Sequence, residues 1–125
     1  MQAMHALGAD LWLLTEVHQD VRLPDQQMHV STQRHIKPKQ RWSGISSRWP
    51  ISPLDCDHVG LALARVTTPG CPVLVACSVM PWRGAGTSWP GDPTAKHGLR
   101  FEESLHDHLH AIQRVREGSE PSRTR

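Results

Sequence analysis

Glu16 is the first residue of this 125-residue sequence whose type and position suggest chemistry, because it follows a short apolar run that starts at Leu11. The run Leu11 to Leu14 predicts a strand that is buried on both faces, since a short continuous apolar segment close to glycine suits a covered strand better than an amphipathic helix. Open α/β sheets bind their ligands at the carboxyl ends of such strands. Glu16 is therefore a candidate ligand-binding acid, and the alternative is a solvated acid at a strand end.

The densest group of potential metal ligands is His106, His108 and His110 with Asp107. On a helix, His106 and His110 would share a face at i and i+4, a spacing that can bind zinc, while His108 would point elsewhere. No third ligand stands at a known spacing, and the metalloprotease pattern requires a glutamate beside the first histidine. We therefore interpret this group as an exposed polar face rather than a metal site.

One amphipathic helix is predicted over residues 99 to 116. Its apolar residues recur every three or four positions and form one stripe: Phe101, Leu105, Leu109, Ile112 and Val115. Gly118 is expected to end the helix, and residues 118–125 are expected to form a disordered tail.

The strands needed to build a sheet are predicted upstream of this helix. Residues 59–67 and 73–79 alternate in a way typical of strands, and the Pro- and Gly-containing turn between them predicts an antiparallel hairpin. Residues 44–50 predict a short strand that ends at a proline turn. Residues 22–40 are predicted as a loop or weak edge structure, and residues 81–98 as a loop. The first segment carries a basic cluster that is more simply part of a solvated loop than a phosphate site: Arg34, His35, Lys37, Lys39 and Arg41.

Composition limits the protein class. With 14 basic and 12 acidic residues, the net charge of +2 is too small to imply a nucleic-acid partner by itself. Three cysteines without a CxxC spacing suggest neither a disulfide framework nor a zinc knuckle. The N-terminus lacks a secretory pattern, and the longest apolar run is far shorter than the roughly 20 residues that span a bilayer. We expect one soluble, cytoplasmic domain with no membrane partner.

Three segments in order resemble the endonuclease/exonuclease/phosphatase superfamily of metal-dependent phosphodiesterases, which includes the DNase I-like enzymes. They are Ala9-Asp10-Leu11-Trp12-Leu13-Leu14-Thr15-Glu16-Val17, Gly44-Ile45-Ser46-Ser47-Arg48-Trp49-Pro50 and Val75-Ala76-Cys77-Ser78-Val79-Met80-Pro81-Trp82-Arg83-Gly84. The first is similar to the family strand that ends in a metal-binding glutamate, the second to its short "SR" strand, and the third to a strand that leads into an active-site loop. The resemblance implies a partial α/β sandwich of mostly antiparallel strands with a C-terminal amphipathic helix.

The same resemblance implies a site. Glu16 would bind a divalent cation, normally Mg²⁺, which prefers oxygen ligands and often takes only one or two carboxylates. Arg83 could hold a phosphate through paired hydrogen bonds, and Trp82 could stack on a base or sugar. The implied activity is hydrolysis of a phosphodiester or another phosphoester, with nucleic acid among the possible substrates.

Several family features have no counterpart in the sequence. The family's first strand, with its metal-site Asn, would precede residue 1, and its Asp-x-Asn and Asp-His motifs would follow the helix. We therefore expect residues 1–117 to be a truncated domain of doubtful activity alone, with unpaired strand edges and apolar residues such as Leu11, Leu13, Val73 and Val75 partly uncovered. Such a domain would have low stability or need a partner chain to complete it.

Two alternatives remain open at the level of sequence. A non-catalytic module could bind nucleic acid or protein through the basic loop and the Trp-rich loop. A frameshifted or misannotated reading frame would have no selected function.

Overall fold

The computed structural model describes residues 9–31, 39–54, 56 and 58–118. The chain divides into two compact units, Met1–Val79 and Met80–Arg125, and each is described by itself. A compact unit is not by itself a domain, so the single partial domain over residues 1–117 stays a prediction. The predicted tail, the helical turn expected at residues 2–8 and the basic residues Arg34, His35 and Lys37 lie outside the described residues.

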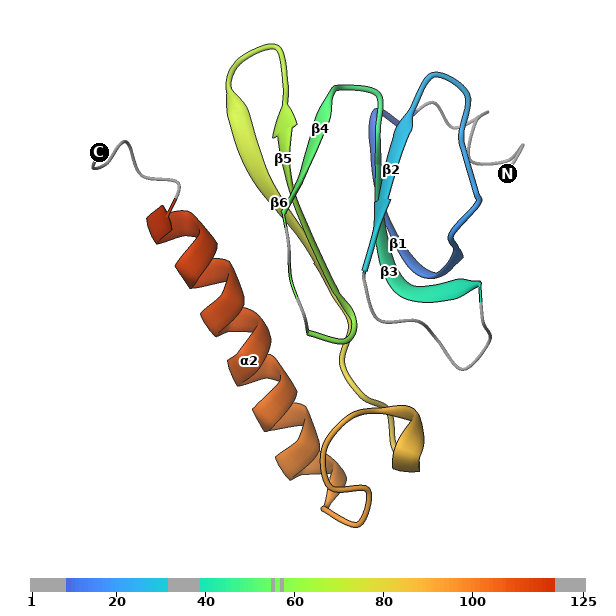
Figure 1. Ribbon diagram of the computed structural model, residues 1–125, viewed down its shortest axis with the longest axis vertical. Coiled ribbons are helices and arrows are strands. Elements are labelled where there is room, and N and C mark those ends of the chain that lie inside the picture. Colours follow the sequence, from blue (N-terminus) through green and yellow to red (C-terminus); the bar gives the residue numbers. More distant parts are fainter. Residues whose placement is uncertain (1–8, 32–38, 55, 57, 119–125) are drawn as a thin grey trace. The chain divides into compact units, whose positions relative to one another are not determined.

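The first unit contains two three-stranded antiparallel sheets (Figure 1). The first sheet has the order β1-β3-β2 and is formed by β1 (Leu11–His18), β2 (Gln27–Val30) and β3 (Gln40–Ser47). The second has the order β4-β5-β6 and is formed by β4 (Ile51–Leu54), β5 (Leu61–Thr67) and β6 (Pro72–Ser78). The described fold is therefore mixed α/β with mostly strands.

The predicted hairpin is confirmed as β5 and β6, which pair antiparallel from Leu61↔Ser78 to Thr67↔Pro72. The interpretation of residues 22–40 as a loop or weak edge structure fits β2, an edge strand that pairs with β3 from Gln27↔Ser47 to Val30↔Gly44. β2 has only four residues, too few for an alternating pattern to be recognised in the sequence. The sequence did not predict β4, which contains Pro53 and lies at a sheet edge, where a strand tolerates proline.

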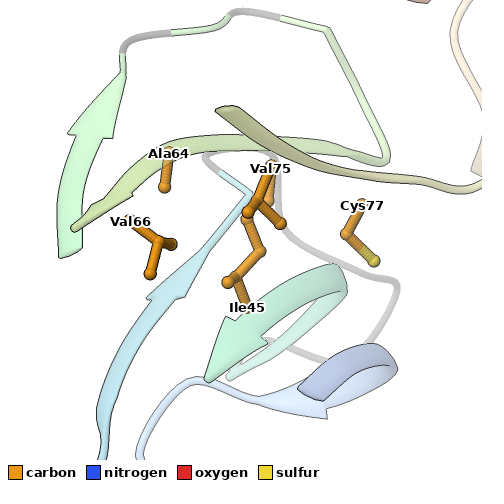
Figure 2. Close-up of a cluster of buried hydrophobic side chains, with 6 residues drawn as sticks. Ile45, Ala64, Val66, Val75 and Cys77 are labelled. Carbon is orange, nitrogen blue, oxygen red and sulfur yellow. The ribbon is translucent and has the colours of Figure 1, made fainter. Parts of the chain in front are cut away.

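The two sheets pack against each other through one apolar cluster (Figure 2). Ile45 of β3 is fully buried and points toward the second sheet. There it meets buried side chains of β5 and β6: Ala62, Ala64, Val66, Val75 and Cys77. Leu61 and Leu63 alternate with these residues along β5 and are also buried, which confirms that both faces of this strand are covered.

β1 does not have the two-sided burial that its apolar run predicts. It is an edge strand of its sheet, and Leu13 is 53% exposed while Leu11, Trp12 and Leu14 are half-buried. A strand at a sheet edge has a neighbouring strand on one side only, so the apolar side chains of β1 are only partly covered. The expectation of uncovered apolar residues holds for Leu13 and fails for Val75, which is buried in the core.

The second unit contains the short 3-10 helix η1 (Gly86–Ser88) and the long helix α2 (His97–Gly118). The predicted helix is confirmed, begins two residues earlier than expected and ends at Gly118. The two buried residues of α2 are Arg100 and His108. Four of its apolar residues are exposed: Leu99, Phe101, Leu105 and Leu109. Among the described residues no helix is long and apolar enough to cross a membrane.

Candidate functional site

Glu16 occupies an unusual place in β1. The strand continues to His18, and Glu16 lies between the pairs Thr15↔Ser43 and Val17↔Arg41. The prediction that Glu16 stands at the carboxyl end of a strand was therefore wrong. The sheet is antiparallel, so its strands do not share one carboxyl edge at which ligands would collect.

The backbone of Glu16 has a φ of +50°, a left-handed conformation inside a strand. This conformation interrupts the alternation of the strand, because Thr15 and Glu16 are both exposed and Val17 is buried. A side chain with a Cβ is rarely held in this region without compensation from its surroundings, and such strained residues cluster at functional sites. Glu16 thus presents its carboxylate to solvent from a conformationally strained position.

Gly44 on β3 accommodates this distortion. A Cβ at Gly44 would lie 2.9 Å from Cγ1 of Val17 and 3.4 Å from Cγ1 of Val30, so a larger residue would push against the packed strands. Gly44, the first residue of the second family-like segment, therefore leaves room for Val17 to pack against the sheet.

The first unit brings the three family-like segments together where they form strands. The first and second segments pair directly as β1 and β3, and Asp10 joins them further through an ion pair of 2.9 Å with Arg48. The third segment enters through β6, where Sγ of Cys77 donates to the carbonyl oxygen of Leu14 at 3.4 Å. The first and third segments, more than 60 residues apart in the chain, are thus in contact through Leu14 and Cys77.

Cys77 is a structural thiol rather than a reactive one. It is buried, and burial raises the pKa of its thiol, while hydrogen bonds with the backbone of Gly44 and Leu14 act in the opposite direction and are weaker. A thiol with a raised pKa is protonated at neutral pH and is a poor nucleophile. We assign Cys77 to the contact between the sheets.

Trp82 and Arg83 lie in the second unit, on a loop that is held in place by α2. Trp82 is 39% exposed and meets the buried Trp89 edge to face, with ring centroids 6.4 Å apart. Arg83 beside it is exposed. An exposed indole next to a guanidinium could stack on a base and contact a phosphate, as the resemblance implies.

Arg100 anchors this loop, although no sequence pattern singles it out. Its Nη2 donates to the carbonyl oxygens of Gly86 and Trp89 at 2.9 and 2.8 Å. Trp89 is held again by its Nε1, which donates to Oγ of Ser104 at 2.9 Å. An arginine on a helix reads as an exposed charge in a sequence, so only the fold shows that it is buried and tied to backbone oxygens.

The histidine group on α2 does not form one exposed polar face. His106 and His110 are exposed, as expected, but His108 is 2% exposed. His108 lies four residues after Ser104 and three before Ala111, which are half-buried, so the three share one side of the helix. The apolar stripe of the helix is instead exposed at Phe101, Leu105 and Leu109. The interpretation as a polar face therefore holds for two histidines and was wrong for the third.

A cluster of three or more metal-ligating side chains is absent from the part of the chain that the structure describes. No three His, Cys, Asp or Glu side chains there lie close enough to hold a metal ion. Mg²⁺ accepts one or two carboxylates together with oxygen donors from water or substrate, so an exposed carboxylate such as that of Glu16 fits this ion. Zn²⁺ at a structural site requires four ligands.

The chain matches no protein-family model, and no curated protein or solved structure is significantly similar to it.

Proposed function

We propose that this protein is a Mg²⁺-dependent phosphoester hydrolase of the endonuclease/exonuclease/phosphatase type, in which Glu16 supplies a carboxylate ligand for the metal. The observation that carries the proposal is the strained and exposed Glu16, at the position where the resemblance expects the metal-binding acid. The pairing of the first two family-like segments as β1 and β3 supports it further.

In this proposal, Glu16 binds the metal, whereas Arg83 and Trp82 contact the substrate. Bound Mg²⁺ would polarise a phosphoryl oxygen and stabilise the leaving group during attack by water. Glu16 would hold the cation through a carboxylate oxygen of its exposed side chain. Arg83 and Trp82 are the proposed contacts for phosphate and for a base or sugar, which makes a phosphodiester or nucleic acid the preferred substrate class.

The experiment is hydrolysis of bis(p-nitrophenyl) phosphate and of plasmid DNA by the full chain, with Mg²⁺ and with EDTA. We expect slow turnover that requires Mg²⁺ and that falls to the no-protein background in Glu16→Gln, because the amide has the shape of the acid without its charge. Glu103→Gln is the matched control, since it removes an exposed acid of α2. Turnover that persists in Glu16→Gln, or no turnover that requires Mg²⁺, would contradict the proposal.

A second candidate function is a non-catalytic module that binds nucleic acid, and the contact of Trp82 with Trp89 beside Arg83 favours it. Such binding would weaken steeply with salt, because phosphate contacts release counterions. It would be reduced in Trp82→Ala and unchanged in Glu16→Gln, whereas the hydrolase proposal requires Glu16. Fluorescence anisotropy with labelled single-stranded DNA separates the two.

A further inference from the structure

We propose that His106 and His110 form a two-histidine binding site for a late first-row transition metal on the exposed side of α2. The two residues stand at i and i+4 of a helix that is continuous from His97 to Gly118. Their rings are stacked, with centroids 6.2 Å apart and planes inclined by 1°. Imidazole lone pairs lie in the ring plane, so a shared metal ion requires the rings to turn from this parallel stack, and the i and i+4 spacing keeps both within reach of one ion.

Neither ring is fixed by burial, since both side chains are exposed. Rotation about their side-chain torsions can therefore turn one nitrogen of each ring toward a shared ion, at the roughly 2.0–2.1 Å at which imidazole binds zinc. The helix sets the spacing of the two donors in advance, so a metal ion does not need to order the backbone. The preorganised spacing lowers the entropic cost of binding.

The charges around the pair favour a cation. Glu102 and Glu103 lie four and three residues before His106, and Asp107 lies three residues before His110, so the three carboxylates are within one helical turn of a histidine. Arg114, four residues after His110, is the basic residue at a comparable spacing. The local balance is negative at neutral pH, which offsets part of the repulsion between a metal ion and basic side chains nearby.

Donor chemistry selects the metal class. Imidazole nitrogen suits Ni²⁺, Cu²⁺ and Zn²⁺, whereas Mg²⁺ prefers oxygen ligands. No third protein ligand stands at a known spacing beside these two histidines. A two-histidine site needs none, because water fills the remaining positions, and its binding is correspondingly weaker than that of a closed structural site. This inference is independent of the proposed function, which concerns another metal at another residue.

The test is isothermal titration calorimetry of the full chain with Ni²⁺, with Mg²⁺ as the comparison ion. Ni²⁺ is the better probe than Zn²⁺ because Zn²⁺ also binds thiolates and Cys71 is exposed. We expect one Ni²⁺ per chain, and we expect affinity to fall by at least about tenfold in His106→Gln or His110→Gln, since even changes outside the ligand shell cost metal sites about 10–100-fold. Mg²⁺ should give no heat that depends on these histidines.

A matched control is the double variant H110Q/Q113H, which keeps the composition and the number of histidines. It moves the second histidine to i+7 from His106, about 10.5 Å along the helix at a rise of 1.5 Å per residue, too far for one ion. Both positions are exposed, so the fold should be unaffected. Loss of tight Ni²⁺ binding in this variant supports the site. Equal affinity of the original chain and the double variant, or Ni²⁺ binding unchanged in both single variants, would overturn it.

Discussion

At the scale of single residues, Glu16 combines two properties that are rarely found together in a strand: a left-handed backbone and an exposed carboxylate. The sequence predicted the acid from its place after an apolar run. It could not predict the backbone conformation, because glutamate carries no preference for positive φ that a pattern would reveal. The strain is nonetheless the part that argues for a role, since an ordinary solvated acid has no need of it.

Glu16→Gly tests whether this strain is real. A left-handed conformation costs a residue with a Cβ about 1–2 kcal/mol, and glycine in a strand costs about 0.5–1 kcal/mol in lost chain freedom. The first effect is larger, so we expect the free energy of unfolding in urea to be equal or higher in Glu16→Gly. Thr15→Gly, one residue earlier in β1 and without positive φ, should lower it. A loss of stability in Glu16→Gly as large as in Thr15→Gly would show that the conformation is not strained.

Cys77 makes a separate prediction about pH. Burial raises the pKa of its thiol above the ordinary value of 9.0. Below that pH both the folded and the unfolded chain keep the proton, and above it the unfolded chain loses the proton first, so the stability falls as pH rises. Urea unfolding at several pH values above 9 should show a smaller decline in Cys77→Ala than in the original chain. An identical decline would mean that the thiol titrates alike in both states.

At the scale of elements, strong local patterns were predictable and weak ones were not. The β5–β6 hairpin and α2 were predicted because their apolar residues repeat over seven or more positions. The four-residue strands β2 and β4 lack such a repeat, and they form because neighbouring strands offer them backbone partners. The apolar run of β1 does not itself reveal whether its strand lies at a sheet edge, so the uncovered Leu13 was expected only from the resemblance, which implies missing neighbouring strands.

Arg100 is the residue on which the loop of the second unit depends most. Its two bonds to the carbonyl oxygens of Gly86 and Trp89 involve a charged donor, and such bonds contribute about 1.5–3 kcal/mol each. We expect Arg100→Met to free the loop and to shift the tryptophan fluorescence to longer wavelength as Trp89 gains exposure. Arg114→Met, which removes an exposed arginine from the same helix, is the control. Equal spectra for both variants would contradict the anchoring role.

At the scale of the described molecule, the first unit shows why a sequence can indicate a candidate site without defining its surroundings. The three family-like segments were identified by their order, and the fold places the strands that they form beside one another, through β1, β3 and the Cys77 to Leu14 contact. Which oxygen donors surround Glu16 depends on sheet order and register, and these depend on contacts between residues far apart in the chain. The sequence could therefore single out the carboxylate as a candidate, but it could not predict which residues surround it.

Whether Glu16 binds Mg²⁺ can be measured by calorimetric titration of the full chain with MgCl₂. We predict a saturable heat that is absent in Glu16→Gln and unchanged in Glu103→Gln, both of which remove one exposed acid. Mg²⁺ binding of equal strength in the original chain and in Glu16→Gln, or no Mg²⁺ binding by the original chain, would contradict the account.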